Sequence, residues 1–198
     1  MGALDLVPPR VFEAFLYETP FIGMVVSSVE VYPEECLGGL WGYRAWSAVD
    51  RTRRAIVEQA IPYQKAERTR RSVGIRPKLE WRCKDMLYKL CQLEPIGDFH
   101  SHPNGKSGLS QPDKDSMEIG DVELVIAISR KNRTTPWKYD DNRKELSGVF
   151  GDFRFTMTLH SCYKPKQQNR TFEKIDLLCP FAVGIGSKYF DTTLRFPE

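Results

Sequence analysis

The chain has 198 residues, of which 41% are hydrophobic and 28% charged, so a soluble globular protein with one sizeable core is expected. Its 29 basic and 26 acidic residues leave a net charge of only +3, which is too small to indicate nucleic-acid binding by itself. No apolar run approaches the roughly 20 residues that a membrane-spanning helix needs.

The N-terminal residues and the cysteines bear on the cellular compartment. Residues 1–10 have neither the basic start nor the apolar stretch of a signal peptide, so none is expected. The five cysteines are odd in number and form no CxxC motif, which favours reduced thiols. We therefore expect a cytoplasmic protein.

The first half of the chain alternates predicted strands with helices. Residues 11–16, 35–44, 55–63 and 96–102 have patterns typical of strands. A helix is predicted to begin at Thr19-Pro20, with Thr19 as its cap, and to end before Pro33. Between Leu79 and Leu93, apolar residues recur at intervals of three and four, which predicts an amphipathic helix.

The second half contains two further predicted strands and several polar loops. Ser110 and Pro112 indicate the start of a helix, and residues 122–129 form an apolar run typical of a strand buried on both faces. Residues 149–163 are predicted to form one more strand, and 177–190 has no assignable pattern. The loops are predicted at 104–109, 130–145 and 164–170. This alternation predicts one α/β domain with a single main sheet, a core over about 11–163 and a C-terminal extension at 164–198.

Two of the three histidines lie two positions apart at the end of a predicted strand. Because side chains alternate between faces along a strand, His100 and His102 point the same way and can reach one metal ion. Asp113 follows 11 residues after His102 (113 − 102), across a loop long enough to bring its carboxylate to the same ion. Two imidazoles and one carboxylate leave a fourth position for water, which is typical of catalytic zinc sites.

Simpler interpretations exist for the individual residues. An H-x-H pair alone is more often two surface histidines than a metal site, and Ser110 alone is equally well explained as a helix cap. Asp98 is interpreted as a residue behind the ligands or in solvent, and His160 as a strand histidine with a hydrogen-bond partner. The two RTRR clusters, at 51–54 and 68–71, are interpreted as solvated surface.

The full string is far more specific than its parts. His100-Ser-His102-Pro103, six further residues and then Ser110-x-x-Asp113 resemble the H-x-H-P-x6-S-x-x-D motif of the JAMM (MPN-plus) zinc metalloprotease family. That family also has a glutamate before a glycine-containing strand, and residues 33–42 resemble this element. Matching the spacing assigns the catalytic glutamate to Glu35, with Glu34 as an exposed neighbour. The resemblance covers about residues 31–129.

The resemblance implies a fold, a cofactor and a reaction. The implied fold is a single MPN-type α/β domain, in which a mixed, mainly antiparallel sheet is flanked by helices. One Zn²⁺ per chain is expected on His100, His102 and Asp113, with Glu35 as proton shuttle and Ser110 as donor to the oxyanion. The implied enzyme is a deubiquitinase-like metallopeptidase, an isopeptidase that cleaves after the Gly-Gly tail of ubiquitin or a ubiquitin-like modifier.

The chain resembles prokaryotic relatives, archaeal ones among them, of the proteasome-lid deubiquitinase. The implied partners are ubiquitin or a ubiquitin-like protein with its conjugates and a proteasome-like particle, and neither nucleic acid nor membrane is expected. In this family the modifier's tail is held as an added strand, and residues 70–78 and 130–145 occupy the places of two insertions that flank the groove. Two alternatives stay open: a peptidase for a sulfur-carrier protein, and a non-catalytic MPN scaffold module.

Overall fold

The structure is a computed structural model, and it describes residues 10–46, 53–69, 72–131, 135–165 and 169–188. The strands are β1 (Val11–Leu16), β2 (Leu37–Trp46), β3 (Arg53–Pro62), β4 (Glu67–Arg68), β5 (Val73–Gly74), β6 (Glu94–Pro103), β7 (Val122–Arg130), β8 (Lys138–Asp140), β9 (Glu145–Phe150), β10 (Phe153–Tyr163) and β11 (Thr171–Leu178). The helices are α1 (Glu18–Val31), α2 (Pro77–Cys91), α3 (Gln111–Ser116) and α4 (Pro180–Lys188).

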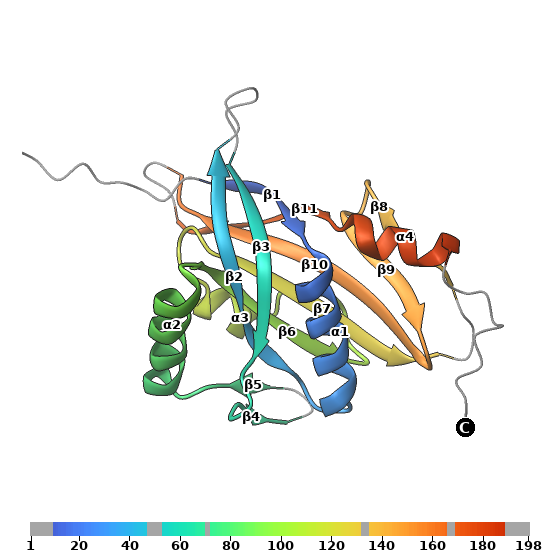
Figure 1. Ribbon diagram of the computed structural model, residues 1–198, viewed down its shortest axis with the longest axis horizontal. Coiled ribbons are helices and arrows are strands. Elements are labelled where there is room, and N and C mark those ends of the chain that lie inside the picture. Colours follow the sequence, from blue (N-terminus) through green and yellow to red (C-terminus); the bar gives the residue numbers. More distant parts are fainter. Residues whose placement is uncertain (1–9, 47–52, 70–71, 132–134, 166–168, 189–198) are drawn as a thin grey trace, which may run out of the picture.

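One long sheet organises the molecule, in the strand order β11-β1-β3-β2-β6-β7-β10-β9-β8 (Figure 1). The end strand β11 also pairs with β10, so the seven strands from β11 to β10 form a closed ring. Strand β10 can serve three neighbours because one of its edges is shared, first by β9 and then by β11. The parallel pairs are β1–β11, β1–β3 and β6–β7, and the other pairs of the sheet are antiparallel.

The closed ring shows that the predicted MPN-type α/β domain, with helices flanking a sheet, was wrong. The closing strand β11 lies within the segment predicted as a C-terminal extension, and its Ile175 and Leu177 are each only 1% exposed. Leu177 pairs with Ala14 of β1, and Ile175 pairs with Leu159 of β10. Local sequence patterns do not reveal pairing between residues so far apart, which is why closure could not be predicted.

Several element boundaries also differ from the predictions. The single strand predicted at 149–163 is part of a hairpin, because Gly151 adopts a φ of 55° and reverses the chain between β9 and β10. The loop predicted at 130–145 contains β8, and the unassigned C-terminal segment contains α4. Helix α1 is preceded by Tyr17 in the cap position, so Thr19 is not its cap.

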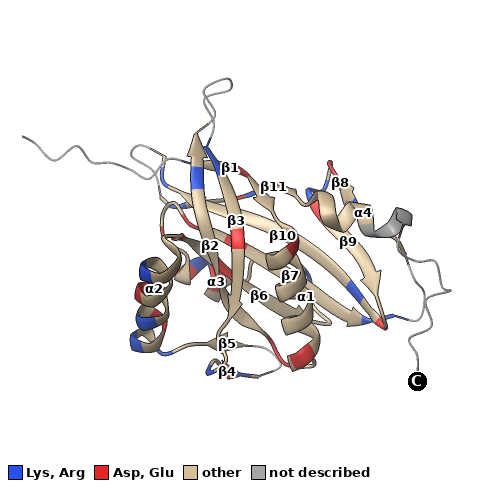
Figure 2. Ribbon diagram, in the orientation of Figure 1, with Lys and Arg blue, Asp and Glu red and all other residues tan. Residues whose placement is uncertain are grey.

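The predicted amphipathic helix is present as α2, but it lies on the surface. None of its residues is buried, and charges of both signs lie along it (Figure 2). Lys84 pairs with Glu80 at 2.6 Å, and Lys89 pairs with Asp85 at 2.7 Å, each one helical turn apart. Such pairs each stabilise an exposed helix by a few tenths of a kcal/mol, roughly 0.2–0.5.

Alternation along β6 separates the core from the polar face that carries the histidines. Phe99 belongs to the hydrophobic core, together with Leu124 of β7 and Met24 of α1. His100 and His102 have the opposite parity to Phe99 along the strand, so their side chains project from the opposite face. Within the described residues, no helix is long and apolar enough to cross a membrane.

Candidate metal centre

The three predicted metal ligands converge at the C-terminal end of β6. The Nε2 atoms of His100 and His102 lie 2.9 Å apart. Asp113 stands in the first turn of α3, as predicted, and its Oδ2 atom lies 3.5 Å from Nε2 of His100 and 3.7 Å from Nε2 of His102. Within the described residues, these three side chains form a group whose ligand atoms could hold one metal ion.

The spacing of the three ligand atoms fits a zinc ion. Ligand atoms at about 2.0–2.1 Å from zinc in tetrahedral geometry lie about 3.3 Å from one another. The observed separations of 2.9, 3.5 and 3.7 Å bracket that value. The donor set of two imidazoles and one carboxylate is also one that zinc accepts in catalytic sites.

The Nδ1 atom of each ligand histidine lies within hydrogen-bond distance of an acceptor oxygen. Nδ1 of His100 lies 2.6 Å from Oε1 of Glu123, and Nδ1 of His102 lies 2.8 Å from the carbonyl oxygen of Lys106. A carboxylate and a carbonyl oxygen only accept, so both Nδ1 atoms must donate. Both Nε2 atoms are therefore the ones directed at the metal position, which is the arrangement usual for zinc-binding histidines.

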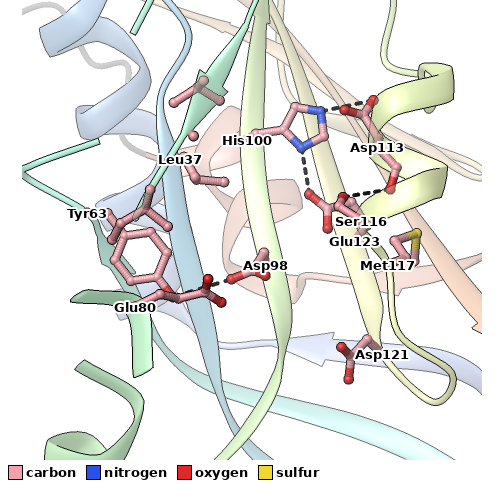
Figure 3. Close-up of a pocket in the computed structure, with 13 residues that line it drawn as sticks. Leu37, Tyr63, Glu80, Asp98, His100, Asp113, Ser116, Met117, Asp121 and Glu123 are labelled. Atoms are coloured by element: carbon pink, nitrogen blue, oxygen red, sulfur yellow. Dashed lines mark hydrogen bonds and ion pairs between the residues drawn. The ribbon is translucent and has the colours of Figure 1, made fainter. Parts of the chain in front are cut away.

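Glu123 was not predicted as part of the site, although the sequence carries a signal for it. It is the one charged residue in the apolar run of 122–129, and it is only 7% exposed. Figure 3 shows the His100 ring between Asp113 and Glu123. A buried carboxylate in an apolar strand needs a partner, and here that partner is His100.

The start of α3 orients the carboxylate ligand. The backbone N–H of Ser110 donates to Oδ2 of Asp113 at 2.6 Å, and the N–H of Asp113 donates to Oγ of Ser110 at 3.3 Å. This reciprocal pair is a capping box, so the predicted cap role of Ser110 is confirmed. Because Oγ accepts from Asp113, the hydroxyl proton of Ser110 stays available for another acceptor.

Glu35 lies beside the same cluster. The Oγ of Ser101 accepts from the N–H of Cys36 at 2.9 Å, and the N–H of Ser101 donates to the Cys36 carbonyl at 3.0 Å. These bonds fix the chain next to Glu35 against β6, between the two histidines. Glu35 is only 8% exposed, whereas Glu34 is exposed, as the resemblance predicts. A cavity of about 360 Å³ is lined by Glu35, Ser72, Val73, His100, His102, Pro103, Gly105, Ser110, Pro112 and Asp113.

Charge and burial shift the protonation of these groups. Burial alone would lower the pKa of His100, but its bonds to Asp113 and Glu123 outweigh burial and raise it to about 10. Burial lowers the pKa of His102, and the charge on His100 lowers it further. Burial raises the pKa of Glu35. Burial opposes the ionisation of Asp113, yet His100 and Ser110 hold its pKa well below the usual range. The cluster thus favours a positive charge at its centre.

A second cavity, of about 280 Å³, is also lined by His100 (Figure 3). Its carboxylates are Glu80, Asp98, Asp113, Asp121 and Glu123. The Tyr63 hydroxyl donates to Asp98 at 3.4 Å, and burial together with the Glu123 charge raises the pKa of Asp98 to about 7. Asp98 therefore lies behind the ligands and is not one of them.

The remaining predicted residues are placed as follows. His160 is buried, lies 3.1 Å from Thr158 and is outside the metal group of the described residues. Arg68 donates to the carbonyls of Tyr63 and Ala66, so it supports a turn and is not simply solvated. Arg51, Thr52, Arg70 and Arg71 lie outside the described residues.

The two segments predicted to flank the groove differ. Val73 lines both cavities, and Gly74 and Ile75 line the second one. The described part of 130–145 lines neither cavity, and its Trp137 packs against Phe155 in the core instead. The described residues of this second segment therefore give the prediction no support, and Trp137 was not recognised as a core residue in a polar stretch.

Comparisons with known proteins identify a solved structure of similar fold but no family. No family model matches the sequence, and no curated protein does either. Among solved structures, the chain is similar to protein DSY2949 from Desulfitobacterium hafniense, with a TM-score of 0.58 and 14% identity, over 84% of this chain and 92% of that chain. At this identity the similarity concerns the fold alone.

Proposed function

We propose that the protein is a zinc-dependent isopeptidase that removes ubiquitin or a ubiquitin-like modifier by cleaving after its Gly-Gly tail. The observation that carries the proposal is the convergence of His100, His102 and Asp113 within bonding range of one ion, with Glu35 and Ser110 lining the same cavity. The spacing of the same residues in the H-x-H-P-x6-S-x-x-D string also supports it.

The side chains around the cavity suit hydrolysis of an amide bond. Zinc held there would lower the pKa of water towards neutrality and polarise the scissile carbonyl. Glu35, whose pKa is raised by burial, would accept a proton and deliver it to the leaving amine. Ser110 would donate its hydroxyl to the carbonyl oxygen as charge develops on it.

The position of β5 supports the proposal that the substrate binds through an extended tail. Val73 of β5 lines the ligand cavity, and among the described strands β5 pairs only with β4. Its second edge can therefore accept the backbone of an added strand, which binds a tail without reading most of its side chains. Glycines next to the cut would let the tail backbone approach the metal ligands closely.

The ligand set argues against the scaffold alternative, because a module without catalysis has no need of three intact ligands and a buried glutamate. Metal analysis of the purified protein should find about one zinc per chain. His102→Ala should lose that zinc, whereas His160→Ala should keep it. Absence of zinc from the wild-type protein would leave the scaffold alternative as the better one.

The identity of the modifier is open to a direct experiment. Several folded modifiers with Gly-Gly tails, ubiquitin and a sulfur-carrier protein among them, would be fused to one reporter and offered to the zinc-loaded protein. Cleavage of ubiquitin-like fusions supports the proposal. Cleavage of the sulfur-carrier fusion alone would favour the other peptidase alternative.

A further inference from the structure

We propose that Glu123 is a positioning residue of the metal centre, which fixes the His100 ring so that its Nε2 atom faces the metal. This inference rests on the proposed zinc site. It assigns a role to a carboxylate that lies outside the H-x-H-P-x6-S-x-x-D string, on the neighbouring strand.

The geometry of the contact supports a fixed ring. Oε1 of Glu123 lies 2.6 Å from Nδ1 of His100, a short distance typical of a hydrogen bond to a charged acceptor. Glu123 is 7% and His100 4% exposed, so water has little access to replace the bond. Because the carboxylate accepts, the imidazole must carry a proton on Nδ1, and Nε2 is the nitrogen left for a metal.

The parallel pairing of β6 with β7 determines which residues meet. Glu123 stands opposite Asp98, and His100 stands opposite Val125, one alternation further along both strands. Glu123 and His100 thus share a face and lie diagonally across the two strands. The register of β6 against β7 therefore brings Glu123 and His100 together, and both residues lie in strands whose backbones are hydrogen-bonded to each other.

The two histidines are oriented by different means. Nδ1 of His102 donates to the backbone carbonyl of Lys106, which no side-chain substitution removes directly. Among the described residues, Glu123 is the side chain that bonds Nδ1 of a ligand histidine. A substitution at Glu123 therefore releases one ligand ring while the other stays oriented.

Glu123 and Glu80 both line the cavity of about 280 Å³ beside His100. The experiment compares Glu123 with Glu80, a carboxylate that bonds no histidine. Glu80 lines that cavity and pairs with Lys84, so Glu80→Gln and Glu80→Leu repeat the charge loss without touching His100. Zinc affinity would be measured by competition with a chelator, and the thermal unfolding of each metal-free variant would be recorded to confirm folding.

Glu123→Leu is expected to weaken zinc binding by about 10- to 100-fold. Glu123→Gln should lose less than Glu123→Leu, because its amide oxygen still accepts from Nδ1. Both Glu80 variants should bind zinc as the wild type does. Equal affinities in the Glu123 and Glu80 series would overturn the proposal, and a wild type without zinc would instead overturn the proposed function.

A measurement on the wild-type protein keeps the test valid even where Glu123→Leu fails to fold. Nitrogen NMR of the zinc-loaded protein should show His100 protonated on Nδ1, with a proton that exchanges slowly with water, and bound to metal through Nε2. Binding through Nδ1, or a rapidly exchanging Nδ1 proton, would contradict a positioning role for Glu123.

Discussion

At the scale of single residues, the centre depends on where protons reside. His100 lies between two carboxylates, while His102 donates to a backbone carbonyl and has a lowered pKa. The 2.9 Å separation of the two Nε2 atoms also suits a hydrogen bond when His100 carries a proton. A proton and a metal ion therefore compete for the same position.

This competition predicts proton release on zinc binding. The pKa of His100 is about 10 without metal, so near pH 7.5 the ring is protonated and zinc must displace one proton. Zinc affinity should accordingly rise about tenfold per pH unit between pH 6 and 8, and level off only above the raised pKa. Calorimetry in buffers of different ionisation enthalpy measures the released protons directly. No release at pH 7.5 would mean that His100 is neutral.

Glu35 and Glu34 offer a test with an internal control. Glu35→Gln should lower the cleavage rate by about 10²–10⁴-fold, because proton transfer to the leaving amine is lost. Zinc should remain bound, since Glu35 is outside the ligand group of the described residues. Glu34→Gln should be silent, because Glu34 is exposed. The reverse pair of phenotypes, read by rate and zinc content, would move the assignment to Glu34.

At the scale of elements, the site depends on the close approach of β6 and β7. Gly97 of β6 permits it, because a Cβ at this position would lie 1.8 Å from the carbonyl oxygen of Val122. A side chain there must push the strands apart. That displacement would disturb the contact between His100, three residues further along β6, and Glu123, one residue beyond Val122 on β7.

Gly97→Ala is therefore expected to lower the free energy of unfolding by about 1–3 kcal/mol or more, and to weaken zinc binding as well. Gly108→Ala is the matched control, because no atom lies within 4 Å of its added Cβ although it stands in the loop between the ligands. Urea unfolding with chelator present, together with zinc titration, measures both effects. A silent Gly97→Ala would show that strand spacing does not control the site.

The site could be predicted at this scale better than its surroundings. Strand alternation placed His100 and His102 on one face, and Ser110 with Pro112 marked the helix that carries Asp113; both are confirmed. Glu123 was missed because its partner lies on another strand. Sheet register, which brings the two together, is not written in local periodicity.

At the scale of the whole molecule, closure of the sheet is the feature that the sequence did not predict. β11 joins β1 to β10, and the three strands come from both ends of the chain. Local patterns predicted most of the strands but not which strands pair with one another. They could therefore not distinguish a closed ring from an open sheet flanked by helices. The apolar alternation of β11 is also weak, with Phe172 and Glu173 both half-buried.

Adjacent leucines test whether β11 belongs to the folded core. Leu177 is 1% exposed and Leu178 is 39% exposed. Leu177→Ala should lower the free energy of unfolding by about 2–5 kcal/mol, while Leu178→Ala should have a much smaller effect. Denaturant unfolding of both variants decides the matter. Equal, small losses would mean that the C-terminal strand is dispensable, as an extension would be.

We propose that the protein, with zinc held by His100, His102 and Asp113, cleaves after a Gly-Gly tail on a folded modifier. A decisive experiment compares cleavage rates of the zinc-loaded protein on fusions of one modifier with Gly-Gly, Gly-Val and Val-Gly tails. Under this proposal, contacts to the folded modifier position the scissile bond, and glycines next to the cut let the tail approach the metal ligands where a bulky side chain would clash. Each bulky replacement is expected to slow cleavage by about a hundredfold, roughly 3 kcal/mol. Equal rates on all three fusions would contradict the proposed specificity and indicate a general peptidase.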